Sequence, residues 1–96
     1  MLRSDLRDRA RQASRLIRPL ASEQRLLILC LLMDGEKAVR DLMELTGLRQ
    51  STLSQHLSRL RVGGLIKSRR EAQRVFYSLT GHESHQVLLS IARRLC

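Results

Sequence analysis

The segment from Leu26 to Met33 constrains the fold most, because every residue in it is apolar. Ser22 stands just before it and can cap a helix N-terminus, and Asp34-Gly35 follows and can end a helix. A helix that is apolar on every side is stable only where other elements cover it. We therefore expect this helix to lie at the centre of the fold, with the other segments packed around it.

The chain has 96 residues and forms one domain, residues 1–96, whose core must be aliphatic because only 2% of the residues are aromatic. A domain this small leaves much apolar surface in water, and a second subunit would cover part of it. Both end segments carry apolar stripes at the spacing of one helix face. The stripes are Leu2, Leu6, Ala10, Ala13 and Ile17 before Pro19, and Val87, Leu88, Ile91 and Leu95 after a capping box from Thr80 to Glu83.

Two further helices are predicted in the middle of the chain, from Val39 to Thr46 and from about Gln50 to Gly63. A tight turn at Gly47-Leu48 joins them, because glycine readily takes the left-handed conformation that ends a helix. The second helix has a leucine stripe and an otherwise polar surface, as the recognition helix of a helix-turn-helix does when it reads base edges in a major groove. Its candidate DNA-binding residues are Arg49, Gln50, Ser51, Thr52, Ser54, Gln55, His56 and Arg59.

After Gly63-Gly64 the apolar residues alternate with polar ones, which predicts a two-stranded antiparallel hairpin. Its turn is expected near Glu71-Ala72-Gln73. A basic hairpin directly after a recognition helix is typical of a wing, which lies beside the DNA backbone or reaches into the minor groove. The candidate DNA-binding residues of the wing are Lys67, Arg69, Arg70, Gln73 and Arg74.

The charge of the chain favours a polyanionic partner. Eighteen Lys and Arg residues stand against 9 Asp and Glu, which gives a net charge of +9, and a dimer would carry twice that. No acidic residue lies between Thr46 and Arg70, in the two segments expected to touch DNA. High charge would also suit an architectural protein that coats DNA without sequence preference, so charge alone leaves that class open.

The stretch "DLMELTGLRQSTLSQHLSRLRVGGLIKSRREAQRVFYSL" resembles the winged helix-turn-helix core of the arsenic-repressor (ArsR/SmtB) family. The resemblance implies a mainly α fold of five helices with a two-stranded wing. It also implies a homodimer through the first and last helices, and repression at double-stranded operator DNA. Arg49 departs from the family, which usually has a serine capping the recognition helix there. Because a cation opposes the dipole at a helix N-terminus, Arg49 is better suited to contact a phosphate, and Gln50 or Ser51 is left as a possible cap.

Two cysteines, Cys30 and Cys96, are the candidate sensing residues. A cysteine such as Cys30 can be plain core packing, whereas Cys96 stands at the end of the sequence and has no such explanation. "RLLILCLL" with a terminal cysteine and "EAQRVFY" in the wing resembles the family's persulfide- and reactive-sulfur-sensing subgroup. That resemblance implies a dithiol that becomes joined by a disulfide or a polysulfide. Because each inserted sulfur adds ~2 Å of reach, a pair held slightly too far apart for a disulfide would favour sulfur donors over peroxide.

Other effectors and functions fit the sequence less well. "VRDLMELTG" lacks the Cys-x-Cys spacing of a soft-metal site, and His82 and His85 have no matching ligands near Arg93 and Arg94, so we expect no metal and no cofactor. His56 is expected to be hydrogen-bonded rather than a ligand. A metal-sensing repressor using both cysteines and a histidine remains the alternative. A thiol enzyme such as a small peroxidase is disfavoured, because nothing in the sequence supplies a base or a cleft around Cys30. The sequence shows no secretory or membrane segment, so we expect a cytoplasmic location.

Overall fold

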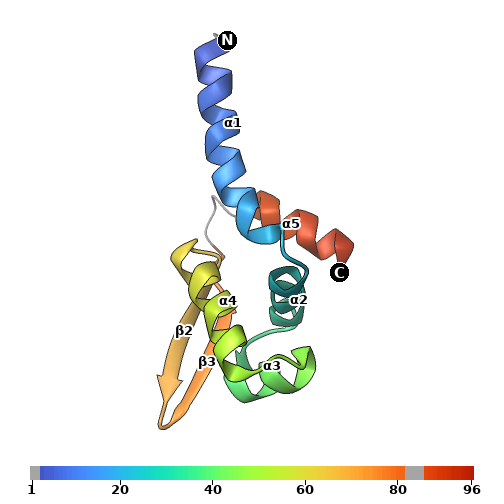
Figure 1. The fold of residues 1–96 in the computed structure, drawn as a ribbon, viewed down its shortest axis with the longest axis vertical. Coiled ribbons are helices and arrows are strands. Elements are labelled where there is room, and N and C mark those ends of the chain that lie inside the picture. The colour runs from blue at the N-terminus through green and yellow to red at the C-terminus, as the bar shows by residue number, and fades with distance from the viewer. Residues whose placement is uncertain (1–2, 82–85) are drawn as a thin grey trace.

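The computed structural model describes residues 3–81 and 86–96, and its longest dimension is 51 Å because the first helix projects from the body (Figure 1). Of the predicted capping box, His82 and Glu83 lie outside the described part, as do His85, Leu2 and the side chains of Val87 and Leu88. The elements in order are α1 (Arg3–Ile17), the 3₁₀-helix η1 (Arg18–Leu20), α2 (Glu23–Leu32), β1 (Lys37–Ala38), α3 (Val39–Thr46), α4 (Gln50–Val62), β2 (Ile66–Glu71), β3 (Arg74–Leu79) and α5 (Gln86–Leu95).

Helix α2 lies at the centre, as its sequence predicts. Ile28 and Leu29 are 0% exposed, and α2 packs against α3, α4, α5 and β3. Ser22 caps its N-terminus by accepting a hydrogen bond from the backbone N–H of Arg25. The helix is not covered on every side, however, because Leu27 is exposed in the single chain.

The helix-turn-helix forms with the predicted boundaries. Helix α3 ends at Gly47, whose φ of 73° is left-handed. Thr46 stabilises the turn, since its hydroxyl donates to the carbonyl of Leu42 and accepts from the backbone N–H of Leu48. Arg49 occupies the N-cap position of α4 without a side-chain capping bond. The turn is therefore held by a left-handed glycine and by the hydrogen bonds of one threonine.

The wing is part of a three-stranded antiparallel sheet, not a separate two-stranded hairpin as the sequence pattern predicts. Strands β2 and β3 pair around a two-residue loop whose first residue, Ala72, has a φ of 57°. Strand β1 pairs with the other edge of β3, and places Lys37 opposite Tyr77 and Ala38 opposite Phe76. A strand of two residues is too short for its alternation to be recognised, so only the fold reveals it.

The last helix packs against the body with residues that lie outside the predicted apolar stripe. Leu89 and Ala92 are 1% exposed and face the body, whereas Ile91 and Leu95 are 49% and 70% exposed. The hydroxyl of Thr80, predicted to cap this helix, instead donates to the carbonyl of Gly64, with the two oxygens 2.7 Å apart. Ile91 and Leu95, the members of the predicted stripe whose side chains are described, thus form a second apolar face that a single chain leaves in water.

Candidate nucleic-acid interface and cysteine pair

The outer surface of α4 presents the polar side chains predicted to contact DNA. Leu53, Leu57 and Leu60 are buried in the core and hold the helix in place. Because the opposite side of a helix then faces outward, the predicted DNA-binding residues other than His56 are exposed. These are Arg49, Gln50, Ser51, Thr52, Ser54, Gln55 and Arg59.

His56 is half-buried and connects the recognition helix to the central helix. Nε of Arg25, in the first turn of α2, donates to Nδ1 of His56 over 3.3 Å. Burial lowers the pKa of His56, and the positive charges of Arg25 and Arg59 lower this pKa further. An Nδ1 that accepts a hydrogen bond belongs to a neutral ring. The prediction that His56 is hydrogen-bonded is therefore confirmed.

The wing presents most of its predicted residues, but Arg69 stands apart. Lys67, Arg70, Gln73 and Arg74 are exposed. Arg69 forms ion pairs with Glu36 and Glu71 and lies over the ring of Phe76, 4.5 Å from the ring centre. Glu36 is 33 positions away along the chain, so no spacing rule could have linked it to the wing.

Arg40 is a candidate interface residue that the sequence reading did not include. It lines a surface groove between α3, the start of α4 and the wing, together with Gln50, Gln73 and Arg74. The first helix of a helix-turn-helix crosses the DNA backbone, so a cation on α3 beside wing cations suits a phosphate. Its position in the chain, on the first turn of α3, was the available signal.

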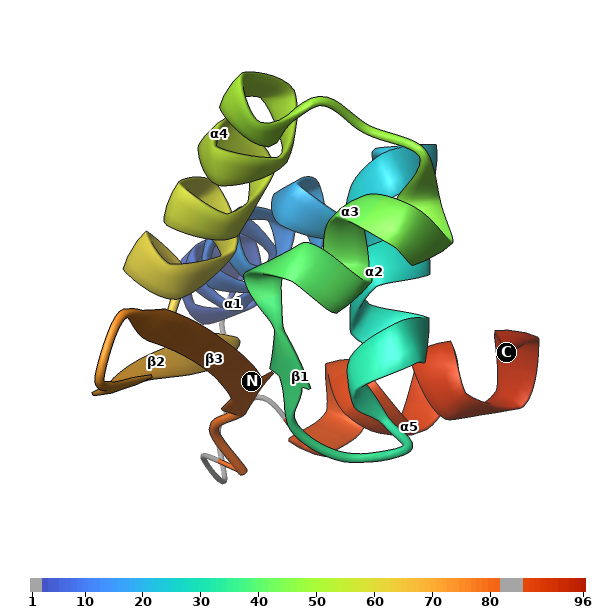
Figure 2. The same cartoon turned by 90° about the horizontal axis from the view of Figure 1, so that it is seen from below.

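Cys30 and Cys96 are brought together and form a disulfide between α2 and the residue that follows α5. Their Cα atoms are 5.7 Å apart, within the usual range of about 4.4–6.8 Å for a direct disulfide. The two cysteines are therefore close enough for a direct disulfide, and the case of a pair held too far apart for one does not apply to this geometry. Helices α2 and α5 also lie side by side in Figure 2, and they pack against each other.

The described part of the chain contains neither a cluster of metal-binding side chains nor a helix that could span a membrane. Residues 3–81 and 86–96 contain no group of three or more His, Cys, Asp or Glu side chains placed to hold a metal ion. None of the described helices has the length and apolar character needed to span a membrane.

Comparison with known proteins shows which family this chain resembles in sequence. Residues 22–68 match the family described as "Bacterial regulatory protein, arsR family". The transcriptional activator HlyU of Vibrio cholerae is 44% identical over 81 residues, which are 84% of this chain and 75% of that protein.

Solved structures extend the likeness to the whole fold. The structure of reduced HlyU from Vibrio cholerae superposes with a TM-score of 0.84 at 40% identity, and covers 95% of each chain. The transcriptional repressor BigR from Xylella fastidiosa superposes with a TM-score of 0.86 at 34% identity, and covers 98% of this chain and 92% of BigR. The chain therefore belongs to the arsR family of bacterial regulatory proteins, and it is a DNA-binding transcriptional regulator with a winged helix-turn-helix fold, not an enzyme.

Proposed function

We propose that this protein is a homodimeric repressor that releases its operator when Cys30 and Cys96 become joined by a reactive sulfur species or an oxidant. The observation that carries the proposal is the bond between α2 and the end of α5. One solved relative, HlyU, is described as a reduced form, which supports a thiol chemistry in this group. In this proposal, the structure with its disulfide is the joined form.

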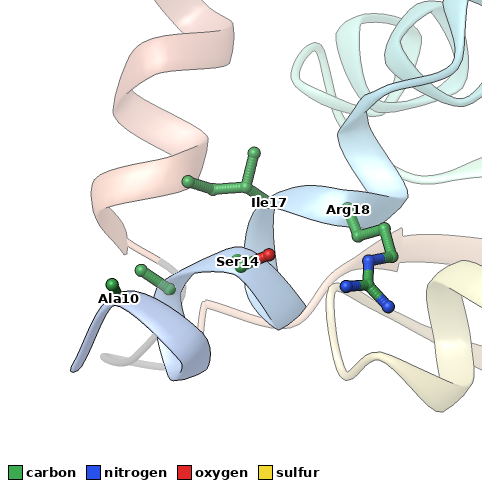
Figure 3. A pocket seen from close by; sticks show the side chains of 5 residues that line it. Ala10, Ser14, Ile17 and Arg18 are labelled. Carbon is green, nitrogen blue, oxygen red and sulfur yellow. The ribbon is translucent and has the colours of Figure 1, made fainter. Parts of the chain in front are cut away.

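A second copy of the chain is the occupant we propose for the exposed apolar faces of α1 and α5. Leu6 and Ile17 on α1 are 60% and 49% exposed, and all described side chains of this helix are solvent-exposed. An isolated helix of 15 residues is marginal in water, so α1 needs a partner to be stable. An open groove runs along it, lined by Ala10, Ala13, Ser14, Ile17 and Arg18 (Figure 3). Ile91 and Leu95 on α5 supply a further apolar face of the same kind.

The dimer would place two copies of α4 in successive major grooves, about 34–36 Å apart. Ser54 and Gln55 would read base edges, while Arg49, Arg59, Arg70 and Arg74 would contact phosphates. As a chromosome-binding regulator it would act in the cytoplasm. Only a ligand or modification that favours one state over the other changes the DNA affinity, and a coupling of about 1–3 kcal/mol is typical.

The joining step uses a persulfide as both sulfur donor and oxidant. One cysteine thiolate attacks the outer sulfur of RS–SH, and RSH leaves with a proton, which makes a cysteine persulfide. The other thiolate then attacks the inner sulfur, so that the disulfide forms and H₂S leaves. A second RS–SH can instead extend the cysteine persulfide by one sulfur before the bridge forms. Attack of the second cysteine on the middle sulfur of that chain then gives a trisulfide, with two RSH and one H₂S released in all. The separation of 5.7 Å between the Cα atoms suits the direct disulfide.

Joining the cysteines would affect the recognition helix through α2. The bond ties the end of α5 to α2, and α2 contacts α4 through core packing and through the hydrogen bond from Arg25 to His56. Because α5 also carries the proposed dimer face, the link would shift the spacing of the two recognition helices. This route is a set of contacts, and the cysteine variants below test whether joining the two cysteines is coupled to DNA binding.

Intact-mass analysis paired with operator binding tests the proposal. The reduced protein is exposed to a polysulfide, to peroxide or to zinc, and operator affinity is measured by fluorescence anisotropy. We expect polysulfide to remove two hydrogens, with or without added sulfur, and to release the operator. Cys30→Ser and Cys96→Ser should each bind the operator and ignore the donor. Release of either variant by polysulfide would refute the cysteine switch, and release of the wild type by zinc alone would favour a metal sensor.

A further inference from the structure

The guanidinium of Arg69 is occupied by two carboxylates from different parts of the chain. Its Nε donates to Oε2 of Glu36 over 2.7 Å, and its Nη2 donates to Oε1 of the same residue over 2.6 Å. Its Nη1 donates to Oε2 of Glu71 over 2.8 Å. All three nitrogens of the side chain therefore have a carboxylate partner, and the contact with Glu36 is the two-point fork that fits arginine best.

The contact between Arg69 and Glu36 joins two separate parts of the fold. Glu36 lies in the loop between the end of α2 and β1, whereas Arg69 lies on β2 at the far edge of the sheet. Phe76 on β3, opposite Arg69 in the strand register, supports the guanidinium from below its plane. The fork thus joins the loop after the cysteine-bearing helix to the outer strand of the wing.

The charges also change what the wing offers to DNA. The hydrogen bonds from Arg69 lower the pKa of Glu36, and both glutamates raise the pKa of Arg69, so Glu36 and Arg69 stay ionised together. A DNA phosphate would have to displace carboxylates that already make the same forked contact. Arg70, the next residue on β2, forms no ion pair with any carboxylate of the described chain.

We propose that Glu36 and Glu71 withhold Arg69 from the DNA backbone, so that Arg69 is a positioning residue that braces the wing and not a phosphate-binding residue. The proposal rests on DNA binding by the wing and refines which of its cations take part. Removing one phosphate contact lowers non-specific and specific affinity together, so withheld charge limits binding to random sequences. The two glutamates would thereby lower the sequence-independent part of the regulator's DNA affinity.

The salt dependence of DNA binding counts the cations that contact phosphates, since each adds about 0.9 to the slope of log affinity against log salt. The reduced protein is titrated with the operator and with a random duplex over a range of salt. We expect Arg70→Gln to flatten the slope by about 0.9, and Arg69→Gln to leave it unchanged. The Glu36→Gln/Glu71→Gln protein should bind random DNA more tightly, with a slope about 0.9 steeper. Adding Arg69→Gln to it should remove that gain.

Asp34→Asn is the matched control, because it removes an exposed carboxylate from the same loop and should leave the slope unchanged. Urea unfolding of each variant checks that the fold is intact. Equal flattening by Arg69→Gln and Arg70→Gln in the wild-type background would overturn the proposal. An unchanged slope in the double glutamine protein would overturn it as well. Failure of the cysteine switch would leave all these comparisons in place, because they use the reduced protein alone.

Discussion

Joining Cys30 to Cys96 should stabilise the protein strongly against unfolding. The two cysteines are 66 residues apart, so the bond closes most of the chain into one loop. The chain-entropy relation for a loop of that length gives about 4.3 kcal/mol at about 25 °C, from freedom that the unfolded chain loses. A chain of this size has a urea m-value of about 1–3 kcal/mol/M, so the unfolding midpoint should rise by about 1.5–4 M.

Urea denaturation of reduced and oxidised protein at the same protomer concentration measures this difference, since dimerisation also contributes to the apparent stability. Cys96→Ser is the control, because it removes the bond at an exposed position and leaves the half-buried Cys30 in its packing. Its midpoint should not respond to the oxidant. Equal midpoints for the reduced and oxidised wild type, with the bond confirmed by mass, would refute the reasoning.

Three other predictions follow from the described surfaces. Gln55→Ala should weaken operator binding by about 1–3 kcal/mol and binding to a random duplex much less, because the side chain is exposed on the outer face of α4. Competition binding measures both losses, and equal loss on the two duplexes would contradict base reading by Gln55. Leu95→Glu should shift the protein from dimer to monomer in sedimentation, because it places a charge at a position of α5 that is 70% exposed in the single chain. Val62→Glu is the control, because Val62 is exposed outside the proposed interface, and it should leave the dimer intact. The lowered pKa of His56 means that the unfolded chain binds a proton at this side chain more readily than the folded chain, so the free energy of unfolding should fall as the pH drops below about 6.5. His56→Gln should remove this pH dependence. An identical pH profile of urea midpoints in the variant and the wild type would contradict the prediction.

Local chemistry determined much of the secondary structure. The bounds of α3, the left-handed Gly47 and the cap at Ser22 were predictable, because each depends on residues a few positions apart. The wing hairpin was predictable for the same reason, since alternation and a short turn are local signals. The exposed polar face of α4 followed from its leucine stripe. Family likeness, rather than spacing, pointed to the pairing of Cys30 with Cys96.

Contacts between distant segments were decided only by the tertiary structure. Strand β1 owes its existence to the open edge of β3, and two residues carry no pattern of their own. The sequence showed an apolar stripe on the last helix that includes Ile91 and Leu95, but the side of α5 that is buried within the chain is the one with Leu89 and Ala92. The pairing of Arg69 with Glu36 needs the loop after α2 to pass beside the wing. The sequence alone thus determined which helices and strands form, because those choices are made by near neighbours. Which face is buried, which charges cancel and how closely two sulfurs approach depend on how the elements pack.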